Sequence, residues 1–346
     1  MVNQPIRIAV DAMGGDYAPS EIIAGAIKGA RLHEVGLLLV GQTEAVEAEL
    51  GRHDVSGLDI RVVPANDVIA MDESPAVALR RKKDASIVVT AKCVKTGDAQ
   101  GMVAAGSTGA AMGAALLYIG RIPGINRPAI GVLLPSSSQS CLLLDAGANA
   151  DCTPDMLVQF AVMGNIYMRT VQGLEKPRVA LLNIGEEAGK GNEFAHTAFQ
   201  LLAADGRFQF TGNVEGKELF SGIADIAVTD GFTGNVALKS AEGVMKMFGT
   251  ILKKEMKSSL RTKMGYLMAE PAFKASIKRV DPEEFGGALL LGINGICVIS
   301  HGGSHAWGIC NAIRVAKEAI VADVLGQISN QIREGIESHE QSALSS

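Results

Sequence analysis

The stretch Ile6-Arg-Ile-Ala-Val-Asp-Ala-Met-Gly-Gly-Asp16 is an apolar, strand-like run that ends in a glycine turn, and a helical pattern over residues 21–33 follows Ser20. Similar runs recur between amphipathic stretches, at residues 37–40, 60–63, 102–105, 129–134, 141–145, 178–184, 223–229 and 296–300. Continuous hydrophobicity within each run is typical of strands that helices cover on both faces. The alternation therefore predicts an α/β fold, a three-layer α/β/α sandwich around a mainly parallel sheet.

Helix signals occupy several of the gaps between these runs. Thr153 is expected to cap a helix that begins at Pro154, because a proline needs no hydrogen-bonded N–H at that position. Further helices are expected over residues 107–119, 192–205, 234–257 and 311–337. The chain shows no Ser/Pro-rich linker, low-complexity tract or fixed repeat, so residues 1–346 are interpreted as a single domain.

The composition argues against some partners and compartments. A net charge of −5 with 4% aromatic residues lacks the basic field and stacking platforms of nucleic-acid binding, so no nucleic acid is expected. Five cysteines without a C-x-x-C pair and an N-terminus without a signal-peptide pattern favour a reducing cytoplasm. The uncharged run between Asp98 and Arg121 could span a bilayer by length, but its central Gly-Ser-Thr-Gly predicts a buried strand–helix unit.

One segment stands apart by its charge. Between Lys253 and Arg279, eight basic residues stand against two acidic ones, a net of +6. Pro271 is expected to interrupt a continuous helix there, so residues 253–279, approximately, are interpreted as a helical hairpin inserted in the domain. Its apolar residues include Leu260, Met264, Leu267, Met268 and Phe273. Two interpretations stay open: a solvated face or dimer contact, or docking on anionic lipid or an acidic carrier protein.

Turns that follow strands are the first candidates for a site, because ligands of open α/β sheets bind at the carboxyl ends of strands. In the Asp11–Asp16 turn, Gly14 and Gly15 permit a close backbone approach, although the turn could be only a tight connection. Gly106-Ser-Thr-Gly109 opens a helix, where free N–H groups and two hydroxyls suit a phosphate. Capping of that helix by Ser107 or Thr108 is the alternative.

A third turn, Asn183-Ile-Gly-Glu-Glu-Ala-Gly-Lys-Gly191, has some features of a nucleotide-binding Walker loop. Its glycine spacing is one residue short, Gly191 stands where a Ser or Thr would bind metal, and Glu186 and Glu187 would repel a triphosphate. A nucleotide site is therefore not expected. Lys190, presented by flexible glycines, can still polarise a carbonyl or hold one phosphate.

The fourth turn, Thr229-Asp-Gly-Phe-Thr-Gly-Asn235, again lies between a strand and a helix. Asn235 offers a neutral amide donor suited to a developing oxyanion, and a simple helix cap is the alternative. The chain has no nucleophile elbow, dinucleotide fingerprint or metal-binding helix, so no cofactor and no metal are expected. His301 and His305 are spaced four apart, but the glycines between them favour a loop.

Together these turns resemble the signatures of one family, the acyl-carrier-protein-dependent phosphate acyltransferases known as PlsX. The matching stretches are, in order, Ile8-Ala-Val-Asp-Ala-Met-Gly-Gly-Asp16, Ala105-Gly-Ser-Thr-Gly-Ala110, Leu144-Asp-Ala-Gly-Ala-Asn149, Asn183-Ile-Gly-Glu-Glu187 and Thr229-Asp-Gly-Phe-Thr-Gly-Asn235. The similarity runs from about residue 6 to residue 335. The family often has His-Gly-Ser-Ser where this chain has His301-Gly-Gly-Ser304.

The resemblance implies a Rossmann-like fold and a homodimer that transfers a long-chain acyl group from acyl carrier protein to inorganic phosphate. The acyl phosphate would then serve a glycerol-3-phosphate acyltransferase of phospholipid synthesis. The resemblance also implies peripheral attachment to the inner face of the cell membrane through the hairpin, near the dimer interface. Lys190 and Asn235 correspond to residues of catalytic importance in the family.

The expected mechanism needs no covalent intermediate, because phosphate itself can attack the thioester carbonyl. The turns at Gly14–Gly15 and Gly106–Gly109 would bind phosphate, Lys190 would neutralise it or polarise the carbonyl, and Asn235 would donate to the oxyanion. The other residues expected to contact phosphate or substrate are Asp11, Asp16, Ser107, Thr108, Asn149, Glu186, Asp230, Thr233 and Gly234. The alternatives are a short-chain phosphotransacylase that uses coenzyme A thioesters and a non-catalytic membrane-docking scaffold.

Overall fold

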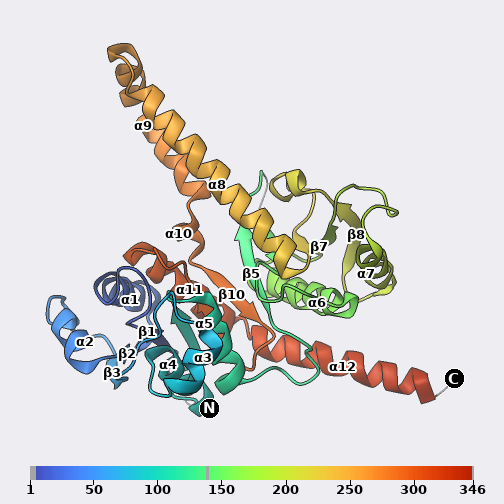
Figure 1. Ribbon diagram of the computed structural model, residues 1–346, viewed down its shortest axis with the longest axis horizontal. Coiled ribbons are helices and arrows are strands. Elements are labelled where there is room, and N and C mark those ends of the chain that lie inside the picture. Colours follow the sequence, from blue (N-terminus) through green and yellow to red (C-terminus); the bar gives the residue numbers. More distant parts are fainter. Residues whose placement is uncertain (1–4, 138–139, 345–346) are drawn as a thin grey trace.

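The computed structural model describes residues 5–137 and 140–344. Within them, eleven strands form one sheet in the order β3-β2-β1-β4-β11-β10-β5-β6-β9-β7-β8 (Figure 1). The strands are β1 (Arg7–Asp11), β2 (Gly36–Gly41), β3 (Ile60–Pro64), β4 (Gly101–Ala104), β5 (Ala129–Leu134), β6 (Cys141–Leu144), β7 (Arg178–Leu182), β8 (Gln209–Val214), β9 (Ile226–Val228), β10 (Ala288–Leu291) and β11 (Ile296–Ile299). All nine strand-like runs of the sequence are strands, and β8 and β10 are additional.

The helices form layers on both faces of this sheet. They are α1 (Ser20–His33), α2 (Thr43–Leu50), α3 (Pro75–Arg81), α4 (Ser86–Thr96), α5 (Thr108–Ala114), α6 (Pro154–Thr170), α7 (Glu193–Ala204), α8 (Gly231–Met256), α9 (Leu260–Val280), α10 (Pro282–Phe285), α11 (Ala306–Val321) and α12 (Val324–Leu344). None of the helices in the described part of the chain is long and apolar enough to cross a bilayer.

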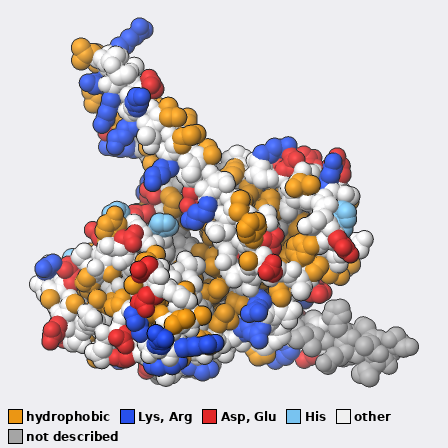
Figure 2. All heavy atoms as spheres, in the orientation of Figure 1, with side chains coloured by type: hydrophobic (Ala, Val, Ile, Leu, Met, Phe, Trp, Pro, Cys, Tyr) orange, Lys and Arg blue, Asp and Glu red, His pale blue; other side chains and the backbone are white. Residues whose placement is uncertain are grey.

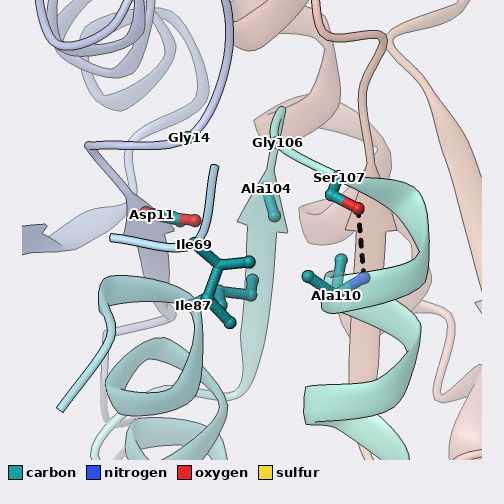
Figure 3. Close-up of a pocket in the computed structure, with 9 residues that line it drawn as sticks. Asp11, Gly14, Ile69, Ile87, Ala104, Gly106, Ser107 and Ala110 are labelled. Atoms are coloured by element: carbon teal, nitrogen blue, oxygen red, sulfur yellow. Dashed lines mark hydrogen bonds between the residues drawn. The ribbon is translucent and has the colours of Figure 1, made fainter. Parts of the chain in front are cut away.

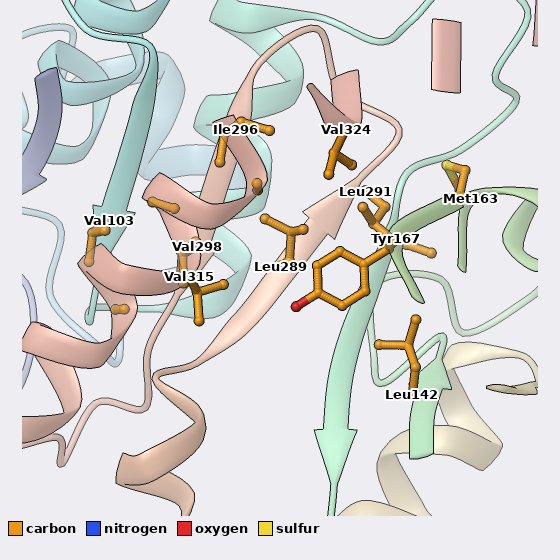
Figure 4. Packing of buried hydrophobic residues seen from close by; sticks show 14 of the residues in the cluster. Val103, Leu142, Met163, Tyr167, Leu289, Leu291, Ile296, Val298, Val315 and Val324 are labelled. Atoms are coloured by element: carbon orange, nitrogen blue, oxygen red, sulfur yellow. The ribbon is translucent and has the colours of Figure 1, made fainter. Parts of the chain in front are cut away.

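Two hydrophobic clusters show that the fold has three layers. Ile8 and Val10 of β1 pack in one cluster with α1, α6, α7 and α11, whereas Ala9 packs in the other with α3, α4 and α5. Successive residues of a strand point to opposite faces, so these clusters are the two faces of the sheet. In Figure 4, Tyr167 of α6 packs beside Leu289 and Leu291 of β10. The expected α/β/α sandwich is confirmed.

Strand direction reverses between the two halves of the sheet. The strands β3, β2, β1, β4 and β11 run parallel, β10 lies antiparallel between β11 and β5, and β5 is antiparallel to β6. β6, β9, β7 and β8 are again parallel to one another. The sheet is therefore mainly parallel within each half, but the carboxyl ends of the strands lie at opposite edges of the sheet in the two halves.

The twist of the sheet reduces this opposition. Neighbouring strands rotate by about 20–25°, so the five steps from β4 to β9 accumulate roughly 100° or more. The strands β4 and β9, which would point in opposite directions in a flat sheet, therefore become roughly perpendicular. The space-filling view shows a hollow between the two halves, below the base of the hairpin (Figure 2).

Several helix boundaries differ from the expected ones. The helix expected over residues 107–119 is α5 followed by a π-helical turn, Ala115–Ile119. The helix expected over residues 311–337 is two helices, α11 and α12, and Asp323 between them has a positive φ of 48°. The helix expected from residue 234 begins at Gly231, where Asp230 caps it.

The hairpin is present, and its arms are longer than expected. α8 and α9 lie antiparallel and project from the body of the protein (Figure 1). The prediction that Pro271 interrupts the helix is wrong, because α9 continues through it from Leu260 to Val280. A proline removes one N–H donor and crowds the preceding turn. On this exposed helix, where no residue is buried, water can bond the freed carbonyl.

Candidate functional site

The first group of site residues lies where β1 and β4 end. A Cβ added to Gly14 would lie 2.7 Å from Oδ2 of Asp11 and 3.1 Å from the backbone nitrogen of Gly106, so the two turns touch through their backbones. Gly15 has a φ of +112°, which a residue with a side chain rarely adopts. Figure 3 shows these turns around a cavity of about 10 Å³, the room that one water needs. The cavity itself is too small to enclose a phosphate.

Two polar residues of this group organise the turns. Burial raises the pKa of Asp11, while hydrogen bonds from Ser86 and from the backbone of Met13 and Gly14 act in the opposite direction. Its carboxylate therefore faces its own turn. Ser107 caps α5 by accepting a hydrogen bond from the N–H of Ala110 at 3.4 Å. Ser107 thus acts as a helix cap, and its expected contact with phosphate stays a prediction.

A third turn joins this group, and the sequence alone gave it little weight. β11 lies parallel beside β4, so the His301 loop emerges next to Gly106. The N–H of Asp16 donates to the carbonyl of Gly302 at 2.8 Å. Nδ1 of His301 accepts the N–H of Gly303 at 3.0 Å, which leaves Nε2 as the donor of the neutral ring. The signal in the sequence was a polar, glycine-rich turn after the run at residues 296–300.

The second group lies where β6 and β9 end. The buried carboxylate of Asp145 accepts the backbone N–H groups of Ile130, Gly147, Ala148 and Asn149, as well as the side-chain amide of Asn149. Burial raises the pKa of Asp145, and these hydrogen bonds act in the opposite direction. The carbonyl of Asn149 accepts the N–H of Gly231 at 2.7 Å. Asp145 thus fixes the loop of residues 145–149, against which α8 begins.

The first turn of α8 presents Asn235. Asp230 caps the helix by accepting the N–H of Thr233 at 2.8 Å and its hydroxyl at 2.7 Å. Gly234 is buried against the carbonyl of Asp145. Asn235 is exposed, lies beside Gly147, and its amide makes no hydrogen bond to a described residue. Asp230 and Thr233 therefore form a helix cap, whereas the amide of Asn235 is available to a ligand.

The loop with Lys190 follows β7, the neighbour of β9, so it leaves the same edge of the sheet as Asn235. Two asparagines anchor this loop. Nδ2 of Asn183 donates to the carbonyl of Lys190 at 3.0 Å, and Nδ2 of Asn213 donates to the carbonyl of Glu187 at 2.8 Å. The side chain of Lys190 is half exposed, and its Nζ lies 4.0 Å from Glu187.

Glu186 of the same loop turns toward other acids. Its carboxylate and those of Glu215 and Glu218 lie within 4.8 Å of one another. The hydrogen bond and charge of Glu215 raise the pKa of Lys217, and Glu218 and Glu186 add to this effect. Glu186 thus faces a charged surface cluster.

The predicted site residues therefore form two groups. The turns at Asp11–Asp16, Gly106–Gly109 and His301 lie at one edge of the sheet, and Asn149, Lys190 and Asn235 lie at the other. No hydrogen bond or ion pair between described residues joins the groups.

A cysteine nucleophile is not poised in either group. Cys152 lies next to the second group, with its Sγ 3.6 Å from the carbonyl of Asn149. Burial raises its pKa to about 11, with nearby carboxylates adding to the effect, so the thiol stays protonated at neutral pH.

Comparison with solved structures defines the class of protein. The phosphotransacetylase from Streptococcus pyogenes superimposes with a TM-score of 0.62 at 19% identity, covering 92% of this chain and 95% of that one. A 4-hydroxythreonine-4-phosphate dehydrogenase from Klebsiella pneumoniae gives a TM-score of 0.52 at 12% identity, covering 91% and 99%. The protein thus has the α/β fold that these two kinds of enzyme share.

Comparison of sequences defines the family. A family model described as fatty acid synthesis protein matches residues 6–327. The phosphate acyltransferase of Heliobacterium modesticaldum is 51% identical over 330 residues, covering 94% of this chain and 98% of the relative. The phosphate acyltransferase of Pelotomaculum thermopropionicum is 50% identical over 327 residues, covering 94% and 95%. The chain belongs to the phosphate acyltransferase family and is an enzyme of that class.

Proposed function

We propose that this enzyme transfers a long-chain fatty acyl group from acyl carrier protein to inorganic phosphate and releases acyl phosphate. The observation that carries the proposal is the amide of Asn235, which is exposed and makes no hydrogen bond to any described residue. Glycine contacts fix the start of α8 on which it stands, and β9 before that helix lies beside β7, the strand that leads to Lys190. Such a fixed, neutral donor suits a developing oxyanion. The protonated Cys152 next to this group favours direct attack by phosphate over an acyl-enzyme.

The reaction balances without a cofactor. An oxygen of hydrogen phosphate attacks the thioester carbonyl, the C–S bond breaks, and the proton of the phosphate ends on the departing thiolate. Lys190 offsets the charge of the phosphate or polarises the carbonyl, and Asn235 donates to the tetrahedral oxyanion. The Gly14 and Gly106 turns hold the phosphate. Because the two groups of residues lie on different halves of the sheet, closure of the halves over the substrates is part of this mechanism.

The proposal includes a homodimer that attaches peripherally to the inner face of the cell membrane by its hairpin. Leu260 is 81% exposed, Met264 66%, Leu267 68% and Met268 86%, whereas the half-buried Phe273 packs on Tyr266 with ring centroids 5.9 Å apart. Apolar residues with an excess of lysine and arginine suit an anionic lipid surface. The acyl phosphate would then pass to an acyl-phosphate-using glycerol-3-phosphate acyltransferase.

The test is mass-spectrometric detection of acyl phosphate from palmitoyl-acyl carrier protein and phosphate. Asn235→Ala is expected to lower the rate by roughly 10²–10³, the usual effect of losing one oxyanion donor. The Lys190→Ala variant is also expected to form acyl phosphate more slowly, because the substitution removes the cation. Lys239→Ala is the matched control, since Lys239 is exposed one turn further along α8 and pairs with Glu242 at 2.8 Å.

Two results would contradict this assignment. Normal acyl phosphate formation by both Asn235→Ala and Lys190→Ala would reject the roles of these residues. A wild-type enzyme that converts acetyl-coenzyme A and ignores palmitoyl-acyl carrier protein would instead be a short-chain phosphotransacylase.

A further inference from the structure

A basic surface lies on α3, on α4 and on the turn between them. We call the α3–α4 basic surface the set of Arg80, Arg81, Lys83, Lys92 and Lys95. Lys92 is half-buried and the others are exposed, and none of the five forms an ion pair with a described residue. Lys82, between them in sequence, is instead paired with Glu73 at 2.5 Å. Figure 2 shows this positive charge along the lower margin of the left half, where Figure 1 places α3 and α4.

The ring of Tyr118 holds two of these charges together. Nζ of Lys92 lies 5.5 Å from the ring centroid of Tyr118, and Nζ of Lys83 lies 6.0 Å from it. Nζ of Lys92 also donates to the carbonyl of Lys83 at 2.9 Å. Leu117, next to Tyr118, is 63% exposed. Like charges repel, so keeping them close without partners in a protein of net charge −5 points to a ligand that supplies the negative charge.

The acids near these basic residues bond to other groups. Asp84 accepts hydrogen bonds from the backbone and side chain of Asn66, and Asp98 accepts one from the hydroxyl of Thr96. Each of these two carboxylates keeps its charge, but neither forms an ion pair with the basic surface, whose five cations leave the field positive.

Both helices lead from this surface to the first group of site residues. α3 begins at Pro75, which lies against Gly109, and α4 begins at Ser86, which hydrogen-bonds the carboxylate of Asp11. At 1.5 Å per residue, Arg80 lies about 8 Å along α3 and Lys95 about 14 Å along α4 from these starts. The hairpin leaves the protein on the other side (Figure 1). A partner on this surface would leave the hairpin free.

We propose that the α3–α4 basic surface docks the acidic carrier protein whose thioester the enzyme consumes, an inference that rests on the proposed function. Charge complementarity selects this partner, because an acidic protein matches a field of unpaired cations and is steered to it in solution. A lipid surface is less suited, since apolar residues that could insert in a bilayer protrude on the hairpin instead. The exposed Leu117 and the ring of Tyr118 supply the small apolar centre of such an interface.

The test compares two double variants with the same change of charge. Arg80→Glu with Lys95→Glu replaces two of the five cations by carboxylates and so lowers the charge of the basic surface from +5 to +1. Arg169→Glu with Lys176→Glu, at the end of α6 and in the loop after it, is the control, because these exposed residues are also unpaired within the described chain. The donors are palmitoyl-acyl carrier protein and palmitoyl-pantetheine, the thioester without the protein. Calorimetry measures binding of the carrier protein directly.

The surface variant is expected to lose about 10-fold to 100-fold in kcat/KM with the carrier protein at low ionic strength, mainly through KM. It keeps wild-type kcat/KM with palmitoyl-pantetheine, and the control keeps both. Wild-type kcat/KM should fall as salt is added, and that of the surface variant should fall less.

Three results would overturn the proposal that this surface docks the carrier protein. The two double variants could be equally active with palmitoyl-acyl carrier protein, or the surface variant could lose as much kcat/KM with palmitoyl-pantetheine as with the carrier protein. The surface variant could also lose binding to anionic vesicles and keep binding to the carrier protein. A wild-type enzyme inactive with palmitoyl-acyl carrier protein would reject the proposed function. Calorimetry would still decide the docking surface, because carrier binding lost only in the surface variant supports it and binding kept in that variant rejects it.

Discussion

The contact between Gly234 and Asp145 makes a single methyl group a sensitive probe of the second group of site residues. A Cβ at residue 234 would lie 1.9 Å from the carbonyl oxygen of Asp145, well inside the 3.0 Å that real contacts respect. Asp145 cannot yield, because it is fully buried, its N–H donates to Thr229, and its carboxylate is fully bonded. The first turn of α8 must therefore move, by about 1 Å, and Asn235 moves with it.

A displacement of about 1 Å at a reacting group can cost roughly 10² in rate, so Gly234→Ala is expected to lower kcat by about that factor. The assay is steady-state formation of acyl phosphate, with a thermal melt to show that the variant is folded. Gly243→Ala is the matched control on the same helix, because nothing lies within 4 Å of the added methyl group. It should keep full activity and gain about 0.5–1 kcal/mol of helix stability. Wild-type kcat in a folded Gly234→Ala protein would refute the reasoning.

Three further outcomes follow from other parts of the structure. Leu267→Glu with Met268→Glu should abolish flotation with anionic vesicles and leave activity in solution unchanged; unchanged flotation would reject attachment through the hairpin. His301→Ala should raise the KM for phosphate about 10-fold, the effect of losing one hydrogen bond to a charged group, and should leave the KM for the acyl donor unaltered. His301→Gln should restore part of the affinity for phosphate. An equal rise in the KM for phosphate and the KM for the acyl donor would contradict a role of His301 in binding phosphate. Burial acts to raise the pKa of Asp225, but the hydrogen bonds and charge of Arg178 outweigh it and lower the pKa. The stability that this pair contributes is therefore present above the ordinary pKa of 3.8 and is lost as the pH falls through the lower pKa of the folded state. Urea unfolding between pH 6 and about pH 3 should therefore show a smaller loss of stability for Asp225→Asn than for wild type.

The sequence predicts the strands best where burial alone defines them. The run at residues 37–40 becomes the fully buried β2, whose hydrophobicity needs no information from the rest of the fold. β8 was missed because it is an edge strand whose first four residues alternate between exposed and half-buried, and because it contains Gly212. β10 was missed because its four residues follow Gly286 and Gly287, both of positive φ, and its pairing with β5 and β11 depends on contacts distant in sequence.

The contents of the site were easier to predict than its arrangement. Each glycine turn could be recognised locally, and the backbone contact of Gly14 with Gly106 shows why a side chain is excluded there. Strand order is not local. Without it, the adjacency of the His301 loop to Gly106 and the separation of Gly106 from Asn235 were both hidden.

The reversal of strand direction has a consequence for catalysis that a parallel sheet would not impose. In a fully parallel sheet all the glycine turns would line one edge, and one rigid crevice could hold phosphate and thioester together. Here β10 and β5 reverse the direction, and only the accumulated twist inclines the two sets of turns toward each other. In the proposed mechanism each half positions its own ligand, through the backbone contacts at Gly14 and Gly234, and phosphate reaches the carbonyl when the halves close. Under that proposal, a site divided in this way would complete its oxyanion hole, and exclude water from it, only when both substrates are bound.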